Sequence, residues 1–151
     1  MERAVTLDIR RIESRDAGPI LAIQGVTPEI AQWTLWDYLC VARGEMAGWV
    51  AEEAGEVLGF LIARQVVSDI EILNLAVRPD SRRRGIGAAL LAESIKWSMT
   101  FRAERALLEV RASNQAALRF YERHHFHATG RRERYYVAPP DDALVLTLDL
   151  A

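Results

Sequence analysis

Residues 74–91 read Asn-Leu-Ala-Val-Arg-Pro-Asp-Ser-Arg-Arg-Arg-Gly-Ile-Gly-Ala-Ala-Leu-Leu, and this stretch is the most informative part of the chain. A strand pattern leads into a proline turn, three arginines and two glycines, and a long helix pattern follows. Bare N–H groups of the glycine-containing loop and the positive end of the helix converge at one place, an arrangement that binds phosphate. The G-x-x-x-x-G-K-[ST] motif is missing, and Leu90 stands where a dinucleotide fingerprint needs a third glycine or alanine.

Strand and helix patterns surround this stretch on both sides. We expect strands at residues 6–12, 46–53, 56–67, 69–77, 105–111, 127–137 and 143–150, and helices from a Ser14 cap through Ile23 and at 28–43, 83–101 and 114–123. Thr27 and Thr34 compete as the cap of the second helix. Ala54-Gly55 has the length and chemistry of a tight hairpin turn. This order predicts an α+β domain with a mostly antiparallel sheet, helices on both faces, and crossover connections formed by the two later helices.

Length and composition limit the class of protein. The chain has 151 residues, half of them hydrophobic, which predicts one domain over residues 1–151 with a substantial core. The longest apolar run, Val57–Ala63, is far shorter than the roughly 20 residues of a membrane-spanning helix, so we expect no membrane partner. The first residues lack the pattern of an export signal, and Cys40 is the single cysteine, so the sequence predicts a cytoplasmic protein without an intramolecular disulfide.

The charge is unevenly distributed along the chain. A net charge of −2 argues against a general nucleic-acid binder, and we expect no sequence-specific nucleic-acid partner. Residues 78–134 nevertheless carry 12 Arg and one Lys against six acidic residues, whereas residues 1–77 carry six Arg against 12 acidic residues. The middle of the chain is therefore where an anion is expected to bind, and the acidic first part favours a cationic acceptor.

Several motifs occur together with the loop. Arg82-x-x-Gly85-x-Gly87 is followed by Glu109-Val-Arg-Ala-Ser-Asn114, then by Ala117-Leu-x-Phe-Tyr-Glu122, Phe126, Tyr135-Tyr136 and Asp142-Ala-Leu144. In order and spacing they resemble the GCN5-related N-acetyltransferases (GNAT), and among them the RimI-type enzymes that acetylate the N-terminal alanine of a small-subunit ribosomal protein. The match is dense between residues 69 and 148, and earlier it rests on Trp33-Thr34-x-x-x-Tyr38, which resembles the family's tryptophan-serine element. The resemblance implies a three-layer α/β/α domain with a mixed, mostly antiparallel central sheet.

The resemblance also implies a reaction and roles for particular residues. N-acetyl transfer from a thioester needs a neutral amine, a route for its proton and an acid for the departing thiolate. By resemblance, Glu109 is the base and Tyr121 the acid, and the cosubstrate is acetyl-CoA. The implied acetyl-CoA contacts are the main chain of Leu75, Ala76 and Val77, the loop residues Arg82, Arg83, Arg84, Gly85, Ile86, Gly87 and Ala88, and the side chains of Asn114 and Tyr121. The implied acceptor contacts are Trp33, Tyr135 and Tyr136. Glu71 is a further candidate acceptor contact, because its charge, with that of Asp69, favours a cationic acceptor.

Each site residue also has a structural interpretation. Glu109 can pair with Arg111 or another nearby arginine, Tyr121 can be an ordinary half-buried aromatic, and Asn114 fits the N-cap of the helix that follows. Glu71 fits a solvated strand charge. Because Tyr135 and Tyr136 alternate across a strand, at most one of them is expected to face the site. The histidines at positions 124, 125 and 127 lack further ligands at a recognisable spacing, so we expect no metal site.

The expected partner is a protein N-terminus or peptide, with a small-subunit ribosomal protein as one such acceptor, and the expected state is a monomer or weak dimer. The poorly matching first part of the chain leaves transfer to a small amine, such as a polyamine or an aminoglycoside, as an alternative. A different class of function is a non-catalytic acyl-CoA-binding or ribosome-associated module that uses the basic segment for anions.

Overall fold

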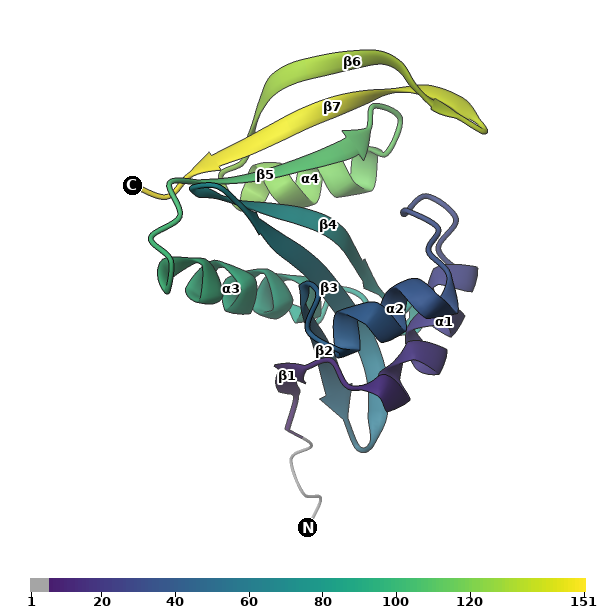
Figure 1. Cartoon of the computed structure of the whole chain (residues 1–151). Coiled ribbons are helices and arrows are strands. Elements are labelled where there is room, and N and C mark those ends of the chain that lie inside the picture. Colours follow the sequence, from purple (N-terminus) through teal and green to yellow (C-terminus); the bar gives the residue numbers. More distant parts are fainter. Residues whose placement is uncertain (1–5) are drawn as a thin grey trace.

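The fold is a seven-stranded sheet with helices on both faces, seen in a computed structural model that describes residues 6–151 (Figure 1). The strands are β1 (Asp8–Arg11), β2 (Ala47–Glu53), β3 (Glu56–Val66), β4 (Asp69–Val77), β5 (Arg105–Arg111), β6 (His127–Val137) and β7 (Pro140–Asp149). The helices are α1 (Ala17–Gly25), α2 (Leu35–Ala42), α3 (Ile86–Met99) and α4 (Gln115–Arg123), with short 3-10 turns at Ser14–Asp16 and Pro79–Ser81. Expectations for residues 1–5, including the lack of an export signal, lie outside the described residues.

The strand order is β1-β2-β3-β4-β5-β7-β6, and within residues 6–151 only the β4–β5 pair is parallel. Helix α3 connects the two parallel strands, and α4 connects β5 to β6, with β7 lying between them. The predicted mixed, mostly antiparallel sheet and its two crossover helices are therefore confirmed. No helix within residues 6–151 has the length and apolar character needed to span a bilayer.

The two faces of the sheet form two hydrophobic clusters, because side chains alternate along each strand. On β3, Leu61 packs with α3 and α4, whereas Phe60 and Ile62 pack with α1 and α2. Figure 1 shows α3 and α4 on one side of the sheet and α1 and α2 on the other. The three layers expected from the sequence are thus present.

Local turn chemistry is mostly as predicted. Ala54 and Gly55 both have positive φ, 53° and 81°, which is the two-residue turn that matches the twist of a β-hairpin. Ser14 is not the cap of α1, however. The N-cap of the first 3-10 turn is Glu13, which forms a capping box with Asp16, and α1 begins only at Ala17.

The helix predicted over residues 28–43 is wrong in its first part. Thr34 accepts a hydrogen bond from the Asp37 N–H at 3.2 Å, and Asp37 in turn accepts from the Thr34 N–H, so the helix starts at Leu35. The Thr27 hydroxyl instead donates to the Ile23 carbonyl at the end of α1, at 2.7 Å. Residues 28–33 are therefore left as a loop between the two helices.

Candidate active site

The candidate site begins where β4 and β5 separate. The two strands pair only from Asp69 with Arg105 to Ile72 with Leu108. On the other side of β4, the register with β3 shifts so that Leu73 is an extra residue, a β-bulge that bends the strand. Beyond this bulge the two strands diverge (Figure 1), and a cavity of about 420 Å³ opens between them.

This cavity brings together predicted site residues from distant parts of the chain. They come from the loop before α2, from both diverging strands, from α4 and from β6, and they are Trp33, Glu71, Leu75, Glu109, Asn114, Tyr121, Tyr135 and Tyr136. The loop residues 82–88 and the strand residues Ala76 and Val77 do not line it. They lie close by, since a Cβ built on Gly87 would come within 3.2 Å of Phe120, the neighbour of Tyr121 on α4.

Glu109 is half-buried on β5 and forms an ion pair. Its Oε1 lies 2.8 Å from Nε of Arg132 on β6. The arginine expected as its possible partner, Arg111, instead donates to the Pro139 carbonyl at 2.8 Å. Sequence reasoning missed Arg132, because its proximity to Glu109 depends on β7 lying between β5 and β6.

Tyr121 is 7% exposed on α4 and keeps a hydroxyl without a protein partner. Its ring packs edge-on against Phe120 and Phe126, with centroids 5.1 and 5.3 Å away. Among the described residues no hydrogen bond involves this hydroxyl, and the side chain lines the cavity. Burial raises the pKa of the Tyr121 phenol, so it stays protonated at neutral pH.

Asn114 is the N-cap of α4, which is the structural interpretation that the sequence suggested beside an acetyl-CoA contact. Its Oδ1 accepts from the Ala117 N–H at 3.2 Å. Within residues 6–151 its Nδ2 has no hydrogen-bond partner, and the residue lines the cavity. The cap and a ligand contact can therefore be made by the same side chain.

Both tyrosines of the Tyr135-Tyr136 pair line the cavity, so the expectation that at most one would face it was wrong. The alternation of β6 is broken by a register shift between Arg132 and Tyr136, where Arg134 has a left-handed φ of 51°. The two rings meet edge-on at 5.1 Å. Hydrogen bonding to Glu109 and the charge of that carboxylate raise the pKa of the Tyr135 hydroxyl.

Glu71, Arg82 and Arg84 each interact with other groups of the protein. Glu71 pairs with Arg64 at 3.0 Å across the β3–β4 ladder, although it also lines the cavity. Arg84 forms an ion pair with Glu53, and Arg82 donates to the Val77 carbonyl at 3.3 Å. Arg82 is therefore held directly at the end of β4, where the loop begins.

The loop before α3 has the backbone expected of an anion site. Gly85 is the N-cap of the helix, with a left-handed φ of 77° and no side chain to cap the first turn. The N–H groups of Ile86, Gly87 and Ala88 have no acceptor within the helix, and the helix dipole adds positive potential there. Ile86 is buried, so only its main chain can face a ligand.

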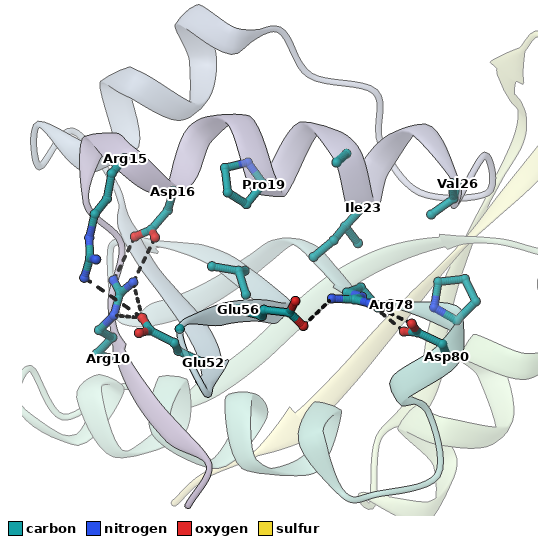
Figure 2. Close-up of a pocket in the computed structure, with 14 residues that line it drawn as sticks. Arg10, Arg15, Asp16, Pro19, Ile23, Val26, Glu52, Glu56, Arg78 and Asp80 are labelled. Carbon is teal, nitrogen blue, oxygen red and sulfur yellow. Dashed lines mark hydrogen bonds and ion pairs between the residues drawn. The ribbon is translucent and has the colours of Figure 1, made fainter. Parts of the chain in front are cut away.

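A second and larger cavity of about 680 Å³ lies between α1, the β2–β3 turn and the segment after β4 (Figure 2). Its charged side chains are neutralised within the fold. Arg10 binds Asp16 at 2.8 Å and also pairs with Glu52, and Arg78 pairs with both Asp80 and Glu56. These groups stabilise the packing of α1, and none of the predicted site residues lines this cavity. Among residues 6–151 no group of three His, Cys, Asp or Glu side chains is placed to hold a metal ion.

Comparison with known proteins gives the family. The model of the acetyltransferase (GNAT) family matches residues 8–126, and the chain therefore belongs to that family. As a GNAT N-acetyltransferase it takes its acetyl group from acetyl-CoA. The resemblance inferred from the loop and the later motifs is confirmed.

Individual relatives agree with this assignment. The [ribosomal protein bS18]-alanine N-acetyltransferase of Escherichia coli (strain K12) is 34% identical over 99 residues, which cover 64% of this chain and 67% of that protein. An N-alpha-acetyltransferase of Sulfurisphaera tokodaii is 34% identical over 119 residues, covering 70% and 71% of the two chains. The crystal structure of the Escherichia coli ribosomal-protein-S18-alanine N-acetyltransferase has a TM-score of 0.83 at 26% identity, covering 97% of this chain and 95% of that chain.

Proposed function

We propose that this enzyme acetylates the N-terminal amine of a protein or peptide, with the N-terminal alanine of a small-subunit ribosomal protein as the expected acceptor. The observation that carries the proposal is the cavity between β4 and β5, where a carboxylate (Glu109), a buried phenol (Tyr121) and a capping amide (Asn114) face one space. Similarity to a ribosomal-protein-alanine N-acetyltransferase and to an N-alpha-acetyltransferase supports the choice of an N-terminal acceptor.

The residues present fit acetyl-CoA. The uncapped N–H groups at the start of α3 suit the pyrophosphate, and the nearby arginines add positive charge. The edge of β4 beyond Ile72 has no strand paired to it on the β5 side within the described chain, so Leu75, Ala76 and Val77 can pair with the pantetheine arm through their main chain. The Asn114 Nδ2 is available to the same arm. When bound, acetyl-CoA supplies the acetyl thioester.

Glu109 and Tyr121 then divide the proton transfers. A peptide α-amino group has a pKa of about 7.7 to 8.0, so a carboxylate is a sufficient base at neutral pH, directly or through water. Glu109 accepts the proton of the attacking amine, and the Tyr121 hydroxyl gives a proton to the departing thiolate. Attack on the thioester is direct, so no covalent bond to the enzyme forms.

The acceptor enters from the side of the cavity formed by the 28–33 loop and the β6–β7 hairpin. Trp33 from the loop and Tyr135 and Tyr136 from the hairpin provide aromatic walls for a peptide backbone. Glu71 lies on the same side and adds negative charge, although Arg64 shares it. An α-ammonium group is thereby attracted before it loses its proton.

The proposal is tested with acetyl-CoA and a peptide that begins with alanine, by following release of free CoA thiol. We expect Glu109→Gln to lower kcat by about 100-fold or more while the Kd of acetyl-CoA stays within about twofold. Glu122→Gln, an equivalent change on the exposed face of α4, is the matched control and should keep wild-type turnover. The peptide should carry the acetyl group on its α-nitrogen, as shown by mass spectrometry.

Different results contradict different parts of the proposal. Acetylation of spermidine or an aminoglycoside, but not of the peptide, would replace the N-terminal acceptor by a small amine. Retention of RNA that falls steeply with salt and ignores acetyl-CoA would favour the ribosome-associated module. Undiminished turnover by Glu109→Gln would remove Glu109 from the role of base.

A further inference from the structure

Three polar side chains that the chemistry above does not use are buried together where α1, α2 and β4 meet. Tyr38 on α2 is fully buried, and Gln24 on α1 and Asn74 on β4 are 7% and 6% exposed. Tyr38 lies between aromatic neighbours, with its ring stacked on Trp33 at 5.6 Å and edge-on to Phe60 at 5.7 Å. Buried polar groups are costly unless they are hydrogen-bonded, so the contacts of these three side chains are informative.

The Gln24 amide holds the main chain of Trp33 from both sides. Its Nε2 donates to the Trp33 carbonyl at 2.8 Å, and its Oε1 accepts from the Trp33 N–H at 2.9 Å. The same Oε1 accepts from the Tyr38 hydroxyl at 2.5 Å. The Gln24 side chain thus supplies hydrogen-bond partners for the Trp33 N–H and carbonyl, which, among the described residues, have no partner in the main chain of a neighbouring element.

Asn74 connects this pair to the sheet. Its Nδ2 donates to the Tyr38 hydroxyl at 3.3 Å and to the Ala31 carbonyl at 3.1 Å. Asn74 directly follows the Leu73 bulge, at the point where β4 leaves β5. The chain of hydrogen bonds therefore runs from the opening of the sheet through Tyr38 and Gln24 to the loop.

The loop held in this way, residues 28–33, forms one wall of the candidate active site. It belongs to neither helix, and its own Ile30 N–H bonds only to Thr27, at 3.3 Å. The contacts of Ala31 and Trp33 with the buried side chains therefore provide its principal hydrogen bonds to the body of the protein. The loop before α3 takes no part in this network, and it meets the 28–33 loop through an ion pair of exposed side chains, Arg82 and Glu29, at 3.9 Å.

We propose that Gln24, Tyr38 and Asn74 are positioning residues that hold the 28–33 loop in the conformation that receives the acceptor amine. Gln24 and Tyr38 do not line the cavity and act through the loop, whereas Asn74 both lines the cavity and bonds to the loop. This inference rests on the proposed function, because it takes the 28–33 side of the cavity to be the acceptor side. It assigns the network to the binding of the acceptor and not to that of acetyl-CoA.

Tyr38→Phe is the variant of choice because it removes one hydroxyl and keeps the buried ring. Gln24 retains its bonds to Trp33, and Asn74 retains its bond to Ala31, so the fold is preserved. We expect the KM of the acceptor peptide to rise about fivefold, while the KM of acetyl-CoA stays within about twofold. Gln24→Leu, which removes both bonds to Trp33, should raise the acceptor KM further.

Hydrogen exchange gives a second readout that does not need an acceptor. The amides of residues 28–34 should exchange about fivefold faster in Tyr38→Phe, with exchange elsewhere unchanged. Ser94→Ala is the matched control, since it also removes one fully buried hydroxyl, which bonds only to Leu91 within α3. The control should leave loop exchange and both KM values at their wild-type levels.

Each remaining outcome bears on one proposal. Unchanged loop exchange and unchanged acceptor KM in both Tyr38→Phe and Gln24→Leu would overturn the positioning role. An equal rise in both KM values, or a lower melting temperature alone, would also overturn it, because the network would then be only structural. If loop exchange is faster in Tyr38→Phe but the wild-type enzyme acetylates no peptide, the proposal of an N-terminal acceptor is refuted and the positioning role is not. The KM shift would then be measured with the amine that the enzyme does acetylate.

Discussion

Tyr121→Phe separates a chemical role of the Tyr121 hydroxyl from a structural one. The change removes a single oxygen from a side chain that is 7% exposed, and the ring keeps its packing against Phe120 and Phe126. Within the described residues the hydroxyl makes no hydrogen bond, so its removal breaks none and leaves no partner unsatisfied. The structure therefore assigns the oxygen no part in holding α4 in place.

The expected magnitudes follow from that geometry. A buried hydrogen bond contributes about 1 kcal/mol, and because none is lost here the free energy of unfolding should change by less than about 0.5 kcal/mol. For a chain of this size that corresponds to a shift in Tm below about 2 °C. If the phenol gives its proton to the departing thiolate, kcat should fall by about 100- to 10,000-fold.

The assay combines three measurements on the same preparation. Steady-state release of CoA thiol gives kcat, calorimetric titration gives the Kd of acetyl-CoA, and thermal unfolding followed by circular dichroism gives Tm. A fall in kcat of less than about tenfold would show that another group supplies the proton. A fall in Tm of more than about 5 °C would show instead that the hydroxyl has a structural partner.

Two further predictions concern the loop before α3, which is the proposed acetyl-CoA site, and the packing of α1. Gly85→Ala places a Cβ on a residue with φ of 77°, so we expect a loss of about 1 kcal/mol in urea unfolding and a higher acetyl-CoA KM, with Gly85→Asn less affected because asparagine tolerates this conformation. Equal effects of alanine and asparagine would contradict a backbone cause. Burial would raise the pKa of Asp16, but hydrogen bonds from Arg10 and the Glu13 N–H outweigh it and lower that pKa. The stability it adds is therefore present above about pH 4 and lost as pH falls further, so Asp16→Asn should cost about 2 kcal/mol at pH 7 and much less at pH 2 to 3. The same loss at both pH values would disprove this linkage.

Much of the fold could be predicted because its signals are local. Strand-like runs predict strands at 46–53 and 69–77, which the structure has at Ala47–Glu53 and Asp69–Val77, and the Ala54-Gly55 turn joins β2 to β3. The Arg82–Gly87 loop follows from residues within one short stretch. The error at the start of α2 arose because Thr27 and Thr34 both fit a cap, and the error at α1 arose because Glu13, not Ser14, is the N-cap of the turn before it.

Only part of the candidate site could be predicted from local sequence signals. The motifs named Glu109, Asn114 and Tyr121, but the arginine that binds Glu109 comes from a strand two positions away in the sheet. A left-handed residue at Arg134 turns both Tyr135 and Tyr136 to the cavity, which a regular alternation excludes. No periodic pattern marks either feature.

By itself the sequence determined most of the strands and helices, and it predicted a pyrophosphate loop and a carboxylate base, because hydrophobic period, turn residues and compact motifs are written in adjacent positions. Only the tertiary structure decided how the site opens. The Leu73 bulge parts β4 from β5, and buried side chains from α1, α2 and β4 then hold a loop against the gap. These contacts join residues up to 43 positions apart, and their energies depend on burial that no local pattern records.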